Sequence, residues 1–300
     1  MSWRLLYLKD CEKITVKLDN LLVLKEGEEY TIPLEDINTI MLEDNRSVVT
    51  AKLLSRLNEY KISLVVCDNK MIPCGIMLPF NQYHRTSKLA YKQVYLSEEM
   101  KDKIWSKIIE YKIYNQKAIL EKVKGSVEGV KLLERYISEI DIGDKTNREG
   151  HAAKVYFNSL FGNEFVRHSE DVQNYALNYG YSIIRSNIAR VITMVGLIPN
   201  IGIHHRSELN NFNLVDDIIE PFRPAIDLIV ATTEWKNNFL ERKDKYRLIN
   251  LINSTIGFNG NKYTLAVCIE KFIYEIVKVI ESGSGEIHRP ICELLKEDEL

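Results

Sequence analysis

The chain has 300 residues, of which 40 are basic, 42 are acidic and 45% are hydrophobic, with a formal net charge of −2. This composition predicts a soluble globular protein whose overall field excludes indiscriminate polyanion binding, so any nucleic acid must be held by a local patch. No apolar run reaches the roughly 18 to 20 residues that span a bilayer, and the N-terminus lacks the apolar region of a signal peptide. The five scattered cysteines, without a C-x-x-C pair, are typical of a reducing compartment. We therefore expect a cytoplasmic protein.

The first 80 residues show the two-residue alternation of β-strands. Apolar and polar residues alternate over 13–18 and 29–34, with a charged turn between them, and 63–68 reads as a further strand. One helix is expected from Val49 to Tyr60, where apolar residues recur at helical spacing. These patterns predict a small β-domain with one helix over residues 1–84.

Beyond residue 85 the alternation is replaced by 3.6-residue periodicity. The predicted helices cover 97–123, 126–138, 147–161, 170–195, 211–235, 242–255 and 262–281. The predicted fold class is α+β, with a small N-terminal β-sheet domain that contains one helix, followed by a larger all-α domain over residues 85–300. The tail after residue 281 starts with a Gly/Ser turn and ends acidic, and we expect it to be loosely held.

Three acids lie close together in the segment "NLVDDIIEPFRPAID". On a helix, Asp217 and Glu220 fall on a polar arc opposite an apolar one, which describes any solvated surface helix. Pro221 and Pro224 follow directly, and proline inside a helix removes a backbone hydrogen bond and tends to kink it. The two prolines therefore indicate that the backbone beside these acids has a specific, non-helical geometry.

Glu149 lies at the head of the apolar stripe of the predicted helix 147–161, in line with Ala153 and Tyr156. A carboxylate in that place needs a partner or a shifted pKa. The alternative is a capping box, because Thr146 and Glu149 match the S/T-x-x-E pattern. Both interpretations are open at this point.

His204 and His205 follow the turn-prone stretch "LIPNIG". A loop histidine is often a hydrogen-bonded structural residue, but imidazole is also a frequent metal ligand. A loop histidine, a carboxylate on the next helix and the upstream Glu149 would together make a mixed oxygen and nitrogen site. Such a donor set suits Mg²⁺ or Mn²⁺ and does not suit a closed structural zinc site.

Basic side chains surround this candidate site, and the segment 81–97 combines basic residues and tyrosines without an acid. Such groups neutralise phosphates and stack on bases, although they also describe a solvated face with core tyrosines. The candidate DNA-binding residues are Arg85, Lys88, Lys154, Arg185, Arg206 and Arg223.

Three segments in this order, "NREGHAAKVYF", "LNYGYSIIRS" and "GLIPNIGIHHRSELNNFNLVDDIIEPFRPAID", resemble the CRISPR-associated adaptation integrase family, the first Cas protein, in the form found beside type II effectors. The resemblance covers essentially the whole chain. It implies that Glu149, His205 and Glu220 are catalytic residues that bind a divalent metal, Mg²⁺ or Mn²⁺, with Asp217 as a supporting acid. Many members of the family carry aspartate where this sequence has Glu220.

The resemblance also implies a reaction, in which the 3′-hydroxyl of a captured DNA fragment attacks the edge of a CRISPR repeat by direct transesterification. Endonuclease activity is the related reaction with water. The implied partners are the double-stranded fragment and the repeat DNA, a second copy of the chain through the β-domain, the small second CRISPR adaptation protein, the type II effector nuclease and an accessory adaptation protein, with no membrane. Two other hypotheses stay open: a metal-dependent DNA nuclease of repair, and a non-catalytic assembly scaffold.

Overall fold

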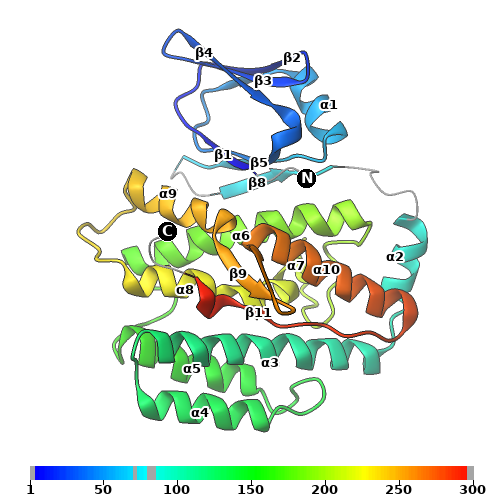
Figure 1. The fold of residues 1–300 in the computed structure, drawn as a ribbon, viewed down its shortest axis with the longest axis vertical. Helices are drawn as coiled ribbons and strands as arrows, with labels where there is room; N and C mark the ends of the chain where they lie inside the picture. The colour runs from blue at the N-terminus through cyan, green and yellow to red at the C-terminus, as the bar shows by residue number, and fades with distance from the viewer. Residues whose placement is uncertain (1–3, 70–72, 80–85, 296–300) are drawn as a thin grey trace.

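A β-rich region lies above a helical region in the computed structural model, which describes residues 4–69, 73–79 and 86–295 (Figure 1). The N-terminal elements are β1 (Arg4–Leu8), β2 (Lys13–Lys17), β3 (Asn20–Lys25), β4 (Glu28–Pro33), η1 (Leu34–Asp36), β5 (Ile37–Leu42), β6 (Val48–Val49), α1 (Ala51–Glu59), β7 (Ser63–Cys67) and β8 (Pro73–Met77). The strands form two four-stranded sheets, ordered β1-β5-β7-β8 and β4-β3-β2-β6.

The predicted strands correspond to β2, β4 and β7, and the predicted helix corresponds to α1, whose N-cap Thr50 accepts a hydrogen bond from the Leu53 N–H. Strand β3 was taken for part of the turn, although it pairs with both β2 and β4. Strand β5 was not predicted from alternation of apolar and polar residues, because all six of its residues are buried. A strand covered on both faces shows a continuous apolar run rather than an alternation.

Helices dominate from residue 86 onward. The elements are α2 (Thr86–Val94), α3 (Glu98–Lys122), α4 (Val127–Ser138), α5 (Arg148–Phe161), α6 (Val172–Val195), α7 (Asn213–Ile218), η2 (Glu220–Phe222), α8 (Arg223–Thr232), α9 (Arg242–Asn250), η3 (Leu251–Asn253), β9 (Thr255–Phe258), β10 (Asn261–Thr264), α10 (Leu265–Ser282), β11 (Pro290–Ile291) and η4 (Cys292–Leu294). The predicted α+β class is confirmed by this order of a β-rich and then a helical region.

A small sheet of order β10-β9-β11 lies inside the region that was expected to be all-α. Its hairpin turns at Asn259 and Gly260, which both have positive φ angles, 47° and 73°. Asn-Gly is the strongest short signal for a two-residue hairpin turn, and it marks this hairpin in the sequence. The tail joins this sheet through β11, and Cys292 and Leu295 are fully buried. The expectation of a loosely held tail is therefore wrong up to residue 295, and the acidic end lies outside the described residues.

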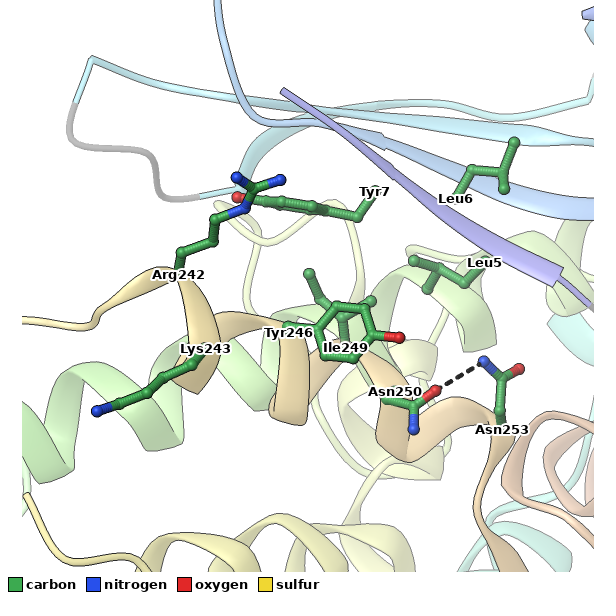
Figure 2. Close-up of a pocket in the computed structure, with 9 residues that line it drawn as sticks. All are labelled: Leu5, Leu6, Tyr7, Arg242, Lys243, Tyr246, Ile249, Asn250 and Asn253. Carbon is green, nitrogen blue, oxygen red and sulfur yellow. Dashed lines mark hydrogen bonds between the residues drawn. The ribbon is translucent and has the colours of Figure 1, made fainter. Parts of the chain in front are cut away.

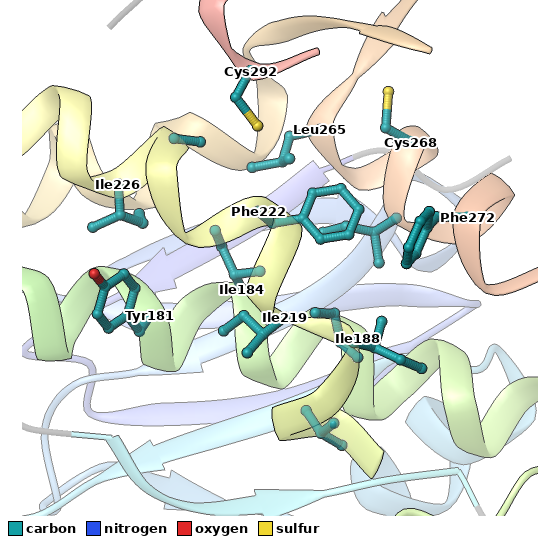
Figure 3. Close-up of a cluster of buried hydrophobic side chains, with 14 of the residues drawn as sticks. Tyr181, Ile184, Ile188, Ile219, Phe222, Ile226, Leu265, Cys268, Phe272 and Cys292 are labelled. Carbon is teal, nitrogen blue, oxygen red and sulfur yellow. The ribbon is translucent and has the colours of Figure 1, made fainter. Parts of the chain in front are cut away.

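Helix α6 is the centre of the helical core (Figure 3). Its side chains Ile184 and Ile188 lie in one buried cluster with Ile219 and Phe222 (Figure 3). The Phe222 ring meets the ring of Phe272 of α10 edge to face, with centroids 5.4 Å apart. This packing fixes the short η2 segment against two long helices.

The single helix predicted over 211–235 is divided into α7, η2 and α8. Pro221 lies in the first turn of η2 and Pro224 in the first turn of α8, where the missing N–H of proline costs no helical hydrogen bond. The prolines thus lie where one helix ends and the next begins, with Glu220 directly before Pro221 and Arg223 between the two prolines.

The β-region and α9 meet at a buried acid, Glu43. Its carboxylate accepts hydrogen bonds from the Tyr7 hydroxyl, from Lys9 at 3.0 Å and from Lys245 of α9 at 3.2 Å. A cavity of about 720 Å³ lies beside this contact, and Figure 2 shows Tyr7 on its sheet side and Arg242 on α9. Glu43 thus links the β-region to α9, because its hydrogen-bond donors come from both parts of the chain.

Among the described residues, no helix is both long and apolar enough to cross a membrane. All five cysteines lie within the described ranges and are free thiols; four are buried and Cys74 is exposed.

Candidate metal centre

Lys112 of α3 connects the two glutamates that the sequence analysis singled out. Its Nζ lies 2.6 Å from Glu149 Oε1 and 2.5 Å from Glu220 Oε2, and its side chain is only 9% exposed. Glu149 Oε1 and Glu220 Oε2 are therefore no further apart than the sum of their two distances to Lys112 Nζ. Burial favours loss of the Lys112 charge, but the two carboxylates outweigh this effect and raise its pKa.

Glu220 is the more enclosed of the two glutamates, with a side chain that is 5% exposed. Burial by itself would raise its pKa, yet Arg223 and Lys112 lower the pKa to about 2, so the group is a carboxylate at neutral pH. Arg223 Nε donates to Glu220 Oε1 at 2.9 Å. The other oxygen, Oε2, lies near Lys112 but accepts no hydrogen bond of normal geometry within the described structure. One Glu220 oxygen thus retains acceptor capacity toward the site.

Glu149 does not act as a helix cap. Helix α5 begins after Asn147, a left-handed residue with φ 54° whose side chain accepts from the Gly150 N–H. Asp144 accepts the N–H groups of both Arg148 and Glu149, at 2.8 and 3.0 Å. The capping-box alternative is wrong because other side chains satisfy these donors, and the Glu149 carboxylate points to Lys112 instead.

His205 is held by Asp217, which is fully buried. Asp217 Oδ1 lies 2.7 Å from His205 Nδ1 and accepts the His205 backbone N–H at 3.0 Å, while Oδ2 accepts the N–H groups of Ile203 and His204. Because a carboxylate only accepts, the Nδ1 atom carries a proton, and Nε2 is left as the ligand atom of the neutral ring. The hydrogen bond to Asp217 is the main reason that the pKa of His205 is raised, with Glu220 and Glu149 adding to it.

The neighbouring histidine has a structural role. The His204 ring stacks on Trp105 of α3, with centroids 4.2 Å apart and planes 2° apart. The His205 ring meets Trp105 edge-on at 5.8 Å. Gly202 is necessary in this loop, because a Cβ atom there would lie 2.3 Å from the His205 carbonyl oxygen. The loop thus presents His205 to the acids, while the exposed His204 stacks on the Trp105 ring.

The donor set fits Mg²⁺ or Mn²⁺, since two carboxylates and one imidazole nitrogen are ligands that these ions accept. In the described part of the chain, however, no three His, Cys, Asp or Glu side chains form a ready coordination shell. The reason is visible in the geometry: the Lys112 ammonium lies between the two glutamates. A divalent cation that bound here would have to compete with Lys112 for the same two carboxylates.

Two of the candidate DNA-binding arginines are engaged by acids. Arg185 Nε donates to Asp216 at 2.7 Å, and its guanidinium lies 4.8 Å from the centroid of the Phe212 ring. Arg223 is committed to Glu220 and to the Tyr181 ring. Their geometry indicates structural partners at the site rather than free phosphate contacts.

The other candidates lie on the surface. Arg206 pairs with Glu98 and keeps 63% of its side chain exposed. Lys88 on α2 and Lys154 on α5 are exposed. Arg85 lies outside the described residues. The exposed three have the freedom to reach a bound polyanion.

Lys112 is the site residue that sequence reasoning missed. The buried residues Ile108, Ile109 and Ile113 surround it on α3. The sequence does indicate Lys112, because a lysine within the apolar stripe of a helix needs an acidic partner once that stripe is buried.

Replacement of Asp217 by asparagine is expected to lower the pKa of His205 and to destabilise the loop. The amide group presents two donors where Asp217 only accepts, so at least one backbone or ring N–H loses its partner, a loss of about 1 to 3 kcal/mol. The raised pKa means that the His205–Asp217 pair stabilises the fold fully below the unfolded pKa and that this contribution is lost as pH rises through the folded value. An NMR titration of the His205 ring in both proteins measures the shift, and an unchanged pKa would contradict the pairing.

The sequence matches the family model described as "CRISPR associated protein Cas1" over residues 6–248. The chain therefore belongs to the Cas1 family. It is 38% identical to the CRISPR-associated endonuclease Cas1 of Neisseria meningitidis serogroup C, over 99% of each chain.

Two solved structures have a similar fold. A casposase bound to an integration product matches with a TM-score of 0.78 and 20% identity, covering 99% of this chain and 97% of that chain. A Cas6-RT-Cas1–Cas2 complex matches with a TM-score of 0.73 and 20% identity, covering 98% of this chain and 36% of that chain. The resemblance noted in the sequence is thus confirmed at the level of the family.

Proposed function

We propose that this chain is a divalent-metal-dependent DNA integrase of CRISPR adaptation, which joins the 3′-hydroxyl ends of captured DNA to a CRISPR repeat. The observation that carries the proposal is the convergence of Glu149 and Glu220 on Lys112 beside a histidine oriented by Asp217. The endonuclease name of the Neisseria relative and the integration product in the casposase structure support DNA strand chemistry.

Glu149, Glu220 and His205 Nε2 would hold Mg²⁺ or Mn²⁺. When bound, the ion would polarise the phosphoryl oxygen and neutralise charge on the attacking and leaving oxygens. Arg223 keeps Glu220 ionised and oriented, and Asp217 fixes the ring of His205. Lys112, once freed from one carboxylate, offers a positive charge to a phosphate.

The proposed reaction needs no nucleophile from the protein. The donor 3′-oxygen forms the new P–O bond, and the bond to the 3′-oxygen of the repeat breaks. The proton of the attacking hydroxyl passes to water, and the leaving oxygen takes one up from water. The residues contribute by holding the reacting groups in line.

The proposed partners are the fragment duplex and the repeat DNA, a second copy of this chain through the β-region, and the small second CRISPR adaptation protein. A structure that contains Cas1 together with Cas2 supports the last of these. The type II effector nuclease and an accessory adaptation protein are proposed on the family resemblance alone. Several copies along one duplex would let a chain of net charge −2 bind DNA through modest basic patches.

A DNA fragment with free 3′-hydroxyls and a supercoiled plasmid that carries the repeat provide the test, with Mg²⁺ or Mn²⁺ added. Branched products in which the fragment is joined to the plasmid are expected. Nicked or fragmented plasmid alone would favour the nuclease of repair, which uses the same site with water as the attacking group. A scaffold would give neither product.

A further inference from the structure

We propose that Asp227, in the middle of α8, is a positioning residue that holds Glu149 and Glu220 in place at the candidate metal centre. It acts through two buried tyrosines, Tyr156 of α5 and Tyr181 of α6. This inference rests on the proposed function, and it adds a residue that lies behind the site and contacts neither the metal ion nor the DNA.

Asp227 is an acid in an apolar part of the helical core. It is only 1% exposed, and the preceding Ile226 lies with Tyr181 in the buried cluster of Figure 3. The Tyr181 hydroxyl donates to Asp227 Oδ1. Burial raises the pKa of Asp227 to about 7, although the hydroxyls of Tyr181 and Tyr156 act in the opposite direction. Replacement of a buried polar group and its partners by apolar groups is often neutral or stabilising, so an acid here indicates a role beyond stability.

Tyr156 links Asp227 to the helix that carries Glu149. Its hydroxyl has no hydrogen-bond partner of normal geometry within the described residues, and the Asp227 carboxyl is the acceptor that interacts with it. Burial and the Asp227 carboxylate raise the pKa of this hydroxyl. Glu149 lies two helical turns before Tyr156, so both side chains project from one side of α5, about 10 Å apart along its axis. The contact between Tyr156 and Asp227 therefore fixes the rotation of α5 and the direction of Glu149.

Tyr181 links Asp227 to Glu220. The Arg223 guanidinium lies over the Tyr181 ring, 4.6 Å from its centroid, and Arg223 Nε donates to Glu220 Oε1 at 2.9 Å. Because Asp227 holds the Tyr181 hydroxyl, the ring offers Arg223 a fixed surface. The orientation of Glu220 therefore depends on a chain of contacts that ends at Asp227.

The backbones of α6 and α8 approach closely beside the Tyr181–Asp227 pair. Gly180 and Ile226 directly precede these two residues, and a Cβ atom on Gly180 would lie 2.6 Å from Ile226 Cδ1. Helix α5, in contrast, packs against α3 and α4, so its Tyr156 reaches from that layer to α8. One carboxyl thus joins three helices, and a buried polar network of this kind specifies a single arrangement of its members.

Melting curves in EDTA test this inference without metal or DNA, because independent residues give additive shifts of the melting temperature. Lys112→Gln is introduced into the full-length wild type and into variants of the network. We expect it to lower the melting temperature by at least about 6 °C in the wild type. In Tyr156→Phe or Asp227→Val the shift from Lys112→Gln should be less than about half as large, because the glutamates no longer converge on the lysine. Asp227→Asn should retain the full shift, because an amide can pair with both hydroxyls.

Tyr179→Phe is the matched control. Tyr179 is a 2% exposed tyrosine on the same helix as Tyr181, and its hydroxyl lies 3.4 Å from Met41 Sδ rather than beside Asp227. The full shift from Lys112→Gln is expected in this background. Equal shifts in all backgrounds would refute the positioning role.

Tyr156→Phe alone decides the question if Asp227→Val does not fold, because it removes one hydroxyl and keeps the ring. Binding of Mn²⁺ without DNA is the second measurement, and we expect Tyr156→Phe to weaken it about tenfold at a temperature at which the variant is folded. If the wild type binds Mn²⁺ and this variant binds it equally well, the inference is wrong.

The outcomes separate this inference from the proposed function. A reduced shift from Lys112→Gln in the network variants, in a chain that binds no Mn²⁺ and joins no DNA, would refute the proposed integrase and leave Asp227 as the residue that positions the two glutamates. Joined DNA together with additive melting shifts would refute the role of Asp227 and leave the integrase in place.

Discussion

Glutamine in place of Glu149 or Glu220 is expected to slow DNA joining by about a thousandfold or more. Each change removes one anionic ligand of the proposed metal, and several kcal/mol of transition-state stabilisation correspond to at least three factors of ten. Glu220→Gln should also lower the melting temperature more than Glu149→Gln, because its side chain is 5% exposed against 27%. Initial rates of joined product with saturating Mn²⁺ and thermal melts in EDTA measure the two effects.

Glu134→Gln is the control for a lost surface carboxylate. Glu134 pairs with Lys117 at 2.9 Å, and its side chain is 66% exposed. We expect a rate within twofold of the wild type, since surface ion pairs contribute little. If Glu149→Gln folds and joins DNA at the wild-type rate, Glu149 has no catalytic part and the proposed metal centre is wrong.

The sequence predicted β-structure where one face of a strand is exposed. Strand β2 alternates buried and exposed residues and was found, while β5 is buried throughout and was missed. The 3.6-residue periodicity predicted the helices equally well, but it did not show that the segment 211–235 is divided into α7, η2 and α8. Only the prolines indicated a break there, and their effect on Glu220 and Arg223 depends on packing against α6 and α10.

The sequence indicates part of the candidate site through charged residues that lie where an apolar helix face is expected. Glu149 stood out because an acid headed an apolar stripe, and the alternative of a capping box depended on neighbours that only the fold shows. Asp144 and Asn147 satisfy the helix terminus, which frees the Glu149 carboxylate. Lys112 was not predicted, because a lysine is not a metal ligand, although a lysine among isoleucines also indicates a buried charge that needs a partner.

The pairing of Lys112 with two acids balances the charge of the candidate site without any metal ion. Glu149 and Glu220 both lie next to the Lys112 ammonium, so without a cation between them their carboxylates would repel each other. The ammonium of Lys112 and the guanidinium of Arg223 balance Glu149 and Glu220 in the absence of any ion. Under the proposed function, a bound metal ion would supply this positive charge instead, and Lys112 would then be available for contact with a DNA phosphate.

Lys112→Gln is expected to destabilise the metal-free protein by about 3 to 5 kcal/mol, because removal of one partner leaves buried charge without its counterion. The melting temperature should fall by at least about 6 °C in EDTA. Mn²⁺ should restore more stability to this variant than to the wild type, since the cation no longer competes with the ammonium for Glu149 and Glu220. Melting curves with and without Mn²⁺ compare the two proteins.

Lys117→Gln is the matched variant on the same helix, because Lys117 pairs with Glu121 and Glu134 on the surface. It should change neither the melting temperature nor the response to Mn²⁺. Equal responses of Lys112→Gln and the wild type to Mn²⁺ would mean that the ion binds elsewhere. A Lys112→Gln variant as stable as the wild type in EDTA would show that the two glutamates do not depend on Lys112 for their charge balance.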